Sequence, residues 1–310
     1  PTQAGTVAEL HPVQHPDVVG VTSTMSAGTA VASTVAQRVA SLMEPTGLSS
    51  GDEATKYGVW AKGTFARGTQ KTYQMTPGYT FNQYGGTLGF DFGEESIFGV
   101  SYSYVKNNAK SKSNSATKDN TTSNILSAYA QYQFTKNIFA NAQVQYGINT
   151  IKKSRGTGGA QNVVANAKPK GNLYGGKATV GYIFAPAQNV NIIPSVGFGY
   201  NKVTVKGYTE SAPAGAVTRT VGKMTAKRTS ALAEIMAKYH HVVSDETTVI
   251  PEAHVNLDYA VSAKNSDTMI TIPNTGIRKG VSSADAIKNL QQFLNWNLAT
   301  SLTVDGVWGA

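Results

Sequence analysis

Residues 138–148 read IFANAQVQYGI, and the alternation in this stretch decides the fold. The apolar positions are Ile138, Ala140, Ala142, Val144, Tyr146 and Ile148, and the positions between them include Asn141, Gln143, Gln145 and Gly147. A period of two residues places the two sets on opposite faces of a β-strand. The run is about as long as a tilted strand that crosses a membrane, roughly ten residues. The sequence therefore predicts a strand with one apolar and one polar face.

The same alternation recurs along most of the chain. The runs are 57–65, 84–92, 98–104, 126–134, 138–148, 174–184, 191–201, 230–240, 249–259 and, less regularly, 294–304. A soluble sandwich would need strands of only about five or six residues, whereas long strands with tyrosine near their ends suit lipid outside and water inside. We therefore predict an all-β, antiparallel, up-and-down transmembrane β-barrel. Pro194 and Pro251 count against two runs, because proline removes a ladder hydrogen bond.

The connections between the runs alternate in length. Short ones are 93–95, 135–137, 185–189 and 243–247; long, polar ones are 67–80, 107–121, 151–170, 205–225 and 261–290. Transmembrane barrels have short periplasmic turns and long external loops. The odd-numbered runs are therefore predicted to run outward, and the first begins at the periplasmic rim.

A segment rich in small residues precedes the first run. Residues 23–46 are predicted to form a helix with Ser or Thr as its N-cap, ended by Pro45 and Gly47. Its single basic residue is Arg38, and its small side chains, which include Ala32, Ala36 and Ala40, suit a narrow space. We predict that this pore helix lies in the barrel lumen, with its start outside and its end at the periplasmic rim. A short surface helix is the alternative.

Composition excludes several classes of protein. The 310 residues include no cysteine, which excludes a disulfide scaffold, a Cys-ligated zinc site and a thiol nucleophile. Charged residues make up 15% of the chain, below the roughly 25% of an ordinary soluble domain. The net charge is +9, but the cations lie in loop-like segments and not on one face, so no nucleic-acid partner is predicted. Anionic lipid head groups are the alternative contact.

No transmembrane helix is predicted either, because no run of about 18 apolar residues occurs. The other structure that satisfies its backbone in lipid is a closed barrel.

Parity within the runs assigns a set of polar side chains to the inner face. Opposite charges on a wet lumen wall can pair with each other or with groups of the helix, Arg38 included. The predicted lumen-facing residues are Trp60, Lys62, Asp91, Gln131, Gln143, Lys177, Arg228, Glu234, Lys238, Glu252, His254 and Asp258.

Carboxylates and histidines in the eighth and ninth runs raise the alternative of catalysis. A set made of Glu234, His240, His241, Glu252, His254 and Asp258 could activate water, as in outer-membrane barrel proteases. Those sites lie at the extracellular rim, whereas His240 and His241 flank a short turn. Glu252 and His254 alone make a poor metal site. We predict no enzyme activity, no catalytic residue, no cofactor and no metal.

Several stretches resemble the β-domains of autotransporters. YGVWAKGTFARG (57–68), YTFNQYGGTLGFDFG (79–93) and IFGVSYSYVKN (97–107) are similar to the opening hairpins of that family. TSNILSAYAQYQF (122–134) and VIPEAHVNLDYAV (249–261) are similar to middle strands, of the kind in rickettsial surface-antigen autotransporters. The resemblance covers roughly 55–260. It implies a twelve-stranded barrel that holds an α-helix in the bacterial outer membrane and exports an N-terminal passenger to the cell surface by type V secretion.

On this basis we divide the chain into a linker from a missing passenger (1–22), the pore helix (23–46) and the translocator barrel (55–310). The chain begins at Pro1 without a signal peptide and ends at Ala310 without the aromatic closing strand of the family. We therefore expect a piece of a longer precursor with ten to eleven strands. Within the tail, VDGVWG (304–309) also resembles a peptidoglycan-binding repeat, with 282–295 as its helix.

The expected partners are outer-membrane lipids and lipopolysaccharide, the chain's own passenger segment, the outer-membrane assembly machinery and periplasmic chaperones. The expected state is a monomer. A passive porin and an outer-membrane protease or adhesin are the alternative functions.

Overall fold

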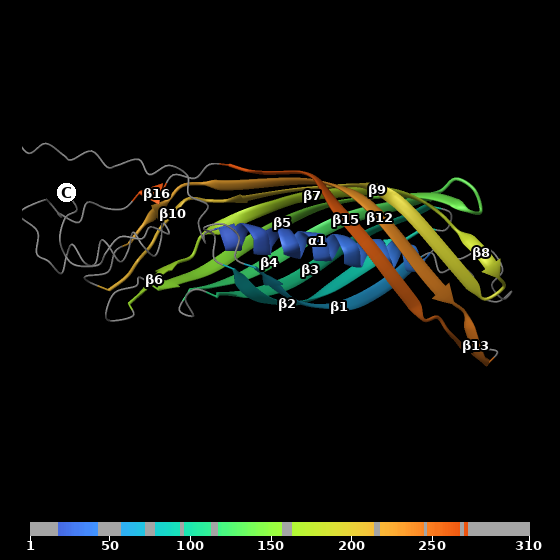
Figure 1. Cartoon of the computed structure of the whole chain (residues 1–310). Coiled ribbons are helices and arrows are strands. Elements are labelled where there is room, and N and C mark those ends of the chain that lie inside the picture. Colours follow the sequence, from blue (N-terminus) through green and yellow to red (C-terminus); the bar gives the residue numbers. More distant parts are fainter. Residues whose placement is uncertain are drawn as a thin grey trace, which may run out of the picture.

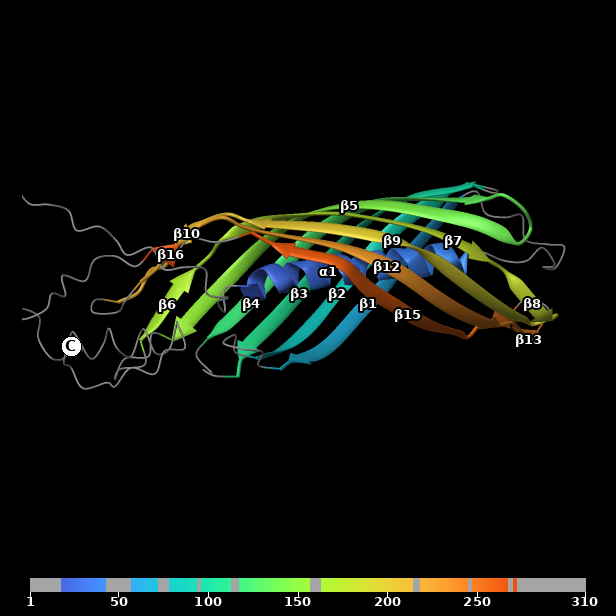
Figure 2. The same cartoon turned by 45° about the horizontal axis from the view of Figure 1, so that its top comes forward.

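The computed structural model describes residues 18–42, 57–71, 78–93, 96–112, 117–156, 163–213, 218–244, 247–266 and 270–271. In this part of the chain, one helix lies along the concave side of a curled antiparallel sheet (Figures 1 and 2).

The sheet consists of long strands that pair in chain order. They are β1 (Tyr57–Gln70), β2 (Tyr79–Phe92), β3 (Ser96–Ser111), β4 (Lys118–Gln133), β5 (Ile138–Gly156), β7 (Lys170–Tyr182), β9 (Val190–Val205), β12 (Met224–Tyr239) and β15 (Glu252–Asn265). Every neighbouring pair is antiparallel, and β1 and β15 are the two edges within the described residues. The predicted fold class, an all-β up-and-down sheet around an N-terminal helix, is confirmed. The predicted tenth run, 294–304, lies outside the described residues.

Shorter strands mark the two ends of the sheet. β6 (Val164–Ala167), β10 (Tyr208–Thr209), β11 (Thr220–Val221) and β16 (Ile270–Thr271) lie at the end that carries the long connections (Figure 1). β8 (Phe184–Ala187), β13 (His241–Ser244) and β14 (Thr247–Val249) lie at the opposite end, where the turns are short. We call these the long-connection end and the short-turn end.

The strands are longer than predicted at the long-connection end. β3 runs to Ser111 and β4 begins at Lys118, so most of the predicted loop 107–121 is a paired hairpin. Apolar outward residues stop near Tyr104, but Asn107, Ala109 and Thr121 are buried on the inner side. The end of the apolar/polar alternation therefore corresponds to the end of the lipid-facing surface, and the strands continue beyond it into water.

One predicted run is broken at a proline. β7 ends at Tyr182 and β8 begins at Phe184, and the pairing with β9 is absent opposite Pro194, which has no N–H to donate. The backbone of Ile183 pairs elsewhere: its N–H donates to the Asn137 carbonyl at 2.7 Å, and its carbonyl accepts from Asn137 Nδ2 at 2.7 Å. Pro251 immediately precedes β15. Both prolines thus fit the sheet.

The outer face carries an apolar band between two aromatic girdles. Exposed rings near the short-turn end are Tyr57, Phe92, Phe98, Tyr132, Tyr182 and Tyr239; those nearer the long-connection end are Tyr84, Tyr104, Tyr146, Tyr174 and Tyr200. From Ile138 to Ile148 the strand rises about 33 Å at about 3.3 Å per residue. A tilt of about 40° reduces this to about 25 Å, the height of a lipid-facing band. Side chains such as Val144, 63% exposed, therefore face hydrocarbon.

The helix α1 spans Val18–Ser41, so it begins before the predicted start at residue 23, whereas residues 43–46 of the predicted 23–46 lie outside the described residues. Residues 18–22, assigned to the linker, are helical. Val21 is buried, and Gly20 packs against Ile151, so contacts with the sheet extend the helix over residues that carry no helix signal of their own. Pro45 and Gly47, the predicted end, lie outside the described residues. Among the described residues, no helix has the length and apolar character needed to cross a membrane.

Candidate functional site

The candidate site is the interface between α1 and the inner face of the sheet. The helix contacts β1 to β5, β7, β9 and β12. Its first turns lie near the long-connection end, where Gly20 faces Ile151 and Asp119. Its last turns lie near the short-turn end, where Arg38 meets Asp91 and Gly58. The helix therefore runs through the curled sheet from the long-connection end to the short-turn end.

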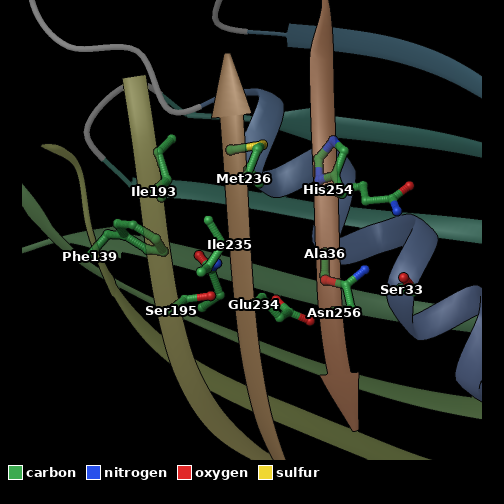
Figure 3. Close-up of a pocket in the computed structure, with 13 residues that line it drawn as sticks. Ser33, Ala36, Phe139, Ile193, Ser195, Glu234, Ile235, Met236, His254 and Asn256 are labelled. Carbon is green, nitrogen blue, oxygen red and sulfur yellow. The ribbon is translucent and has the colours of Figure 1, made fainter. Parts of the chain in front are cut away.

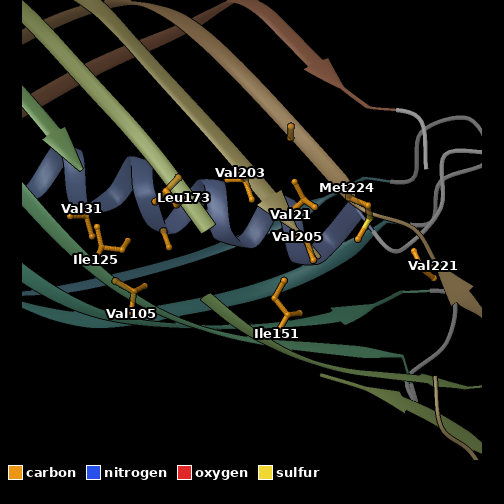
Figure 4. Close-up of a cluster of buried hydrophobic side chains, with 12 residues drawn as sticks. Val21, Val31, Val105, Ile125, Ile151, Leu173, Val203, Val205, Val221 and Met224 are labelled. Atoms are coloured by element: carbon orange, nitrogen blue, oxygen red, sulfur yellow. The ribbon is translucent and has the colours of Figure 1, made fainter. Parts of the chain in front are cut away.

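The half of this interface nearer the long-connection end contains a cluster of buried apolar side chains (Figure 4). Val21, Ala27 and Val31 of α1 belong to one cluster of buried apolar side chains, and the strands supply Val105, Ile125, Ile151, Leu173, Val203 and Val205. Full burial of a valine side chain stabilises by about 1.5 kcal/mol or more. We expected a polar inner face; at this end apolar side chains share it with buried polar ones such as Asn107 and Thr121.

Gly28 lets the helix approach the sheet closely. A Cβ added at Gly28 would lie 2.6 Å from Cδ2 of Leu173. At the same level Gln145 Nε2 donates hydrogen bonds to the Gly28 carbonyl at 3.0 Å and to Asn201 Oδ1 at 3.1 Å. Ser26 adds a hydrogen bond from its hydroxyl to Gln83 Oε1 at 3.1 Å. Close packing and polar contacts thus hold the middle of the helix.

Near the short-turn end, Arg38 anchors the helix to β2. Its Nε donates to Asp91 Oδ2 at 2.9 Å and its Nη2 donates to Asp91 Oδ1 at 3.1 Å. Tyr129 Oη donates to the same Oδ2 at 3.1 Å and accepts from Trp60 Nε1 at 2.8 Å. The Asp91 side chain is only 5% exposed, against 23% for Arg38. The bidentate pair fixes both the register and the rotation of the last helical turns.

The network needs glycine on the neighbouring strands. A Cβ at Gly89 would meet the Trp60 ring at 2.2 Å, and one at Gly99 would meet the Tyr129 ring at 2.2 Å. The two aromatic side chains therefore lie flat over glycine backbone, beside Val35 and Val39 of the helix.

The predicted small helix residues lie where space is narrow. Ala32 is 9% exposed, and Ala40 packs against the apolar cluster of Phe139, Ile183, Ile193 and Met236. Ala36 lines a cavity of about 30 Å³ between α1 and the inner sides of β9, β12 and β15 (Figure 3). A second gap beside Ala36 measures about 10 Å³. A water molecule needs roughly 10–15 Å³ of such volume, so the larger gap has room for two or three waters and the smaller gap for one at most.

The remaining predicted residues form a charged wall on β7, β12 and β15. Lys177 is paired with Glu234. Lys238 Nζ lies 3.7 Å from Glu252 Oε1, and Arg228 Nη2 lies 3.0 Å from Asp258 Oδ1. His254 Nε2 lies 3.2 Å from Glu252 Oε2. The other predicted inward residues lie on strands outside this wall. Gln131 and Gln143 are buried, and Lys62 Nζ donates a hydrogen bond to Gln37 of the helix.

The histidines predicted from the eighth and ninth runs lie near the short-turn end of the sheet or in the charged wall. His240 contacts Asn191 through Nε2 at 3.1 Å, and His241 begins β13 at the short-turn end. Within the described residues, no group of three or more His, Asp or Glu side chains could hold a metal ion.

A buried ion cluster lies at the long-connection end of the sheet, beyond the girdle tyrosines nearer that end. The sequence did not predict this cluster. Glu210 accepts from Arg155 Nε at 2.8 Å and Nη2 at 2.6 Å, and from Arg219 Nη2 at 3.1 Å. Burial alone would raise the pKa of the Glu210 carboxyl, but the hydrogen bonds and charges of the two arginines outweigh burial and lower it. Asp119 pairs with Lys153 nearby at 2.6 Å. These residues come from segments that the sequence reading assigned to loops.

Comparison with known proteins identifies the family. The family model described as Autotransporter beta-domain matches residues 59–306. Outer membrane protein A of Rickettsia conorii is 30% identical over 233 residues, which cover 71% of this chain and 11% of that protein. Outer membrane protein B of the same organism is 25% identical over 236 residues, or 72% of this chain and 14% of that protein. The chain thus spans about a tenth of the length of the curated relatives it matches.

A solved structure shares the fold. The translocator domain of autotransporter NalP from Neisseria meningitidis superposes with a TM-score of 0.51 at 13% sequence identity, over 80% of this chain and 96% of that one.

Proposed function

This chain belongs to the autotransporter β-domain family and is an outer-membrane translocator domain; from this premise we propose that its barrel exports an N-terminal passenger and then retains α1 as a plug. The exported segment is the part of the protein that precedes α1. The barrel supplies a conduit, and α1 is the last exported segment to enter it. Folding of the passenger outside, or the assembly machinery, supplies the driving force.

The direction of α1 is the observation that supports the proposal. Val21 lies in the cluster near the long-connection end, and Arg38 binds Asp91 near the short-turn end. Long connections lie on the cell-surface side of an outer-membrane barrel. The start of α1 therefore lies on the cell-surface side, which is the arrangement expected after N-terminal export through the lumen.

The interface also supports retention of the helix. Five valines of α1 are buried or nearly so: Val21, Val31, Val35 and Val39 with at most 4% exposure, and Val19 in part. The gaps of about 30, 20 and 10 Å³ beside the helix have room for a few waters but not for larger solutes. A porin needs an open lumen, whereas α1 lies along the inner side of the sheet in contact with β1 to β5, β7, β9 and β12.

The proposal includes the finer partners named from the sequence. We infer contacts with outer-membrane lipids and lipopolysaccharide, passage through periplasmic chaperones and the outer-membrane assembly machinery, a monomeric barrel, and no catalysis by the barrel itself. The ion-paired positions of Glu234, Glu252 and Asp258 support a structural role for the inner charges.

An epitope-accessibility experiment tests the proposal. An epitope inserted before Val18 in the natural full-length protein should be cleaved by protease added to intact cells. The same epitope in the short turn 135–137 is the matched control and should be cleaved only after the outer membrane is permeabilised. If protease added to intact cells cleaved the epitope in the turn 135–137 but not the epitope before Val18, the proposed direction of export would be refuted.

A conductance measurement separates the plug from a porin. Deletion of residues 18–41 should open a steady ion conductance in planar bilayers, because α1 fills the lumen. An unchanged conductance would favour the porin and contradict the plug.

A further inference from the structure

The acidic side chains of the described residues all lie in ion pairs on the inner side or in the buried outer cluster. The pairs are Asp91–Arg38, Asp119–Lys153, Glu210 with Arg155 and Arg219, Glu234–Lys177, Glu252–Lys238 and Asp258–Arg228. Within the described part of the chain, the outer face therefore carries no carboxylate to neutralise a cation.

Cations, by contrast, gather on the outer face of the sheet, between the girdle tyrosines nearer the long-connection end and that end. Most of them alternate with buried inward residues, and Lys264 is the register partner of the outward-facing Lys227, so their side chains point outward. The set comprises Arg67, Lys106, Lys110, Lys118, Lys152, Lys170, Lys202, Lys227 and Lys264. These cations form an outward-facing positive surface at the end of the sheet that carries the long connections.

Three of these lysines form a row across adjacent strands. Lys227 of β12 is the register partner of Lys202 on β9 and of Lys264 on β15, so the three side chains share one face. Neighbouring strands are about 4.8 Å apart, so the row spans about 10 Å. Figure 2 shows these strands side by side along the sheet. Like charges directly opposite each other destabilise a sheet, and none of the three has an ion-pair partner among the described residues.

The row lies at a defined depth. On β9 it begins at Lys202, two positions after the girdle residue Tyr200. Girdle tyrosines mark the interface between hydrocarbon and head groups. The lysine ammonium groups therefore reach the head-group layer on the cell-surface side.

We propose that the row of Lys202, Lys227 and Lys264 binds the phosphate groups of the outer-leaflet glycolipid, lipid A of lipopolysaccharide. Three ammonium groups spread over about 10 Å suit a head group that bears more than one phosphate. Bound phosphates remove the repulsion within the row and tether β9, β12 and β15 at the surface. The proposal rests on the outer-membrane location and does not require passenger export, so the two can fail separately.

Lipid binding to the full-length protein tests the proposal. The protein is purified in nonionic detergent, freed of lipid and titrated with bisphosphorylated lipid A, with dephosphorylated lipid A and with phosphatidylglycerol, and bound lipid is counted by native mass spectrometry. The test variant is Lys202→Gln/Lys227→Gln/Lys264→Gln. One control replaces the same lysines with arginine, and another is Lys136→Gln at the short-turn end. Heat-modifiable gel mobility verifies that each variant is folded.

Bisphosphorylated lipid A should bind the glutamine variant about 100-fold more weakly than the natural protein, at about fivefold per lysine. Both controls should bind it normally, and added salt should weaken binding to the natural protein. The proposal is overturned if the glutamine variant binds bisphosphorylated lipid A unchanged. It is equally overturned if dephosphorylated lipid A or phosphatidylglycerol binds the natural protein as tightly.

Discussion

The bidentate pair between Arg38 and Asp91 allows a quantitative test of how α1 is held. Asp91→Asn removes the carboxylate that the Arg38 guanidinium binds through two hydrogen bonds, but the Arg38 side chain is 23% exposed and keeps some hydration. The penalty lies between the roughly 0–1 kcal/mol of a surface pair and the roughly 3–5 kcal/mol of a fully buried one. We take about 2 kcal/mol, which is about a 30-fold change in the equilibrium between seated and displaced helix.

Arg38→Gln should be more harmful than Asp91→Asn. It removes the cation that neutralises the Asp91 carboxylate, which is only 5% exposed. A penalty of about 3 kcal/mol is therefore expected, which is about a 150-fold change in the equilibrium between seated and displaced helix. Neither change should release the helix completely, because the buried valines of α1 each contribute about 1.5 kcal/mol or more. The frequency of conductance bursts of the full-length protein in planar bilayers reports the displaced state.

Two controls make the reasoning refutable. Lys62→Gln removes an exposed hydrogen bond to Gln37 and should change the burst frequency by less than about threefold. The double variant Arg38→Gln/Asp91→Asn should be milder than Arg38→Gln alone, because two neutral side chains leave no buried charge. Equal frequencies for the natural protein and Arg38→Gln, or additive effects in the double variant, would show that the pair does not hold the helix.

Two further predictions concern packing and pH. Gly28→Leu should weaken helix seating by about 2 kcal/mol through overpacking against Leu173; hydrogen exchange of the α1 amides should speed up, and Leu173→Ala should restore much of the protection. Glu210, which lies outside the membrane-spanning segments, has a pKa below its ordinary 4.5, so its pairing stabilises the outer cluster above pH 4.5 and is lost as the pH falls through the lowered pKa. Hydrogen exchange at Tyr208 and Thr209, corrected for intrinsic rates, should show this loss in acid, and Glu210→Gln should abolish the pH dependence; a loss of protection that begins near neutral pH would contradict it.

The inner and outer assignments of strand residues followed from local sequence because a strand has an exact period of two. Once Val144 faces outward, Gln143 and Gln145 must face inward. Asp91, Lys177 and Glu234 were placed on the inner face by the same parity, and they lie there in ion pairs. Their partners could not be read from parity, since pairing depends on the stagger between strands.

The apolar cluster on the inner face was missed although a signal existed. Ile125, Ile151 and Leu173 are apolar at inward positions near the long-connection end, outside the predicted alternating runs. A single apolar residue per strand is weak evidence alone. It becomes meaningful when the register places these side chains beside each other and beside Val31 of the helix.

By itself the sequence determined the strand type, the two faces of each strand and the alternation of short and long connections, because each depends on residues close together in the chain. Tertiary structure alone decided where α1 begins, which carboxylate Arg38 binds and which lysines stand in one row. These features join residues that are distant in sequence, as with Arg38 and Asp91 or Lys202 and Lys264. They depend on the register between strands and on the depth of the helix, which are set only when the sheet curls around α1 and buries both surfaces together.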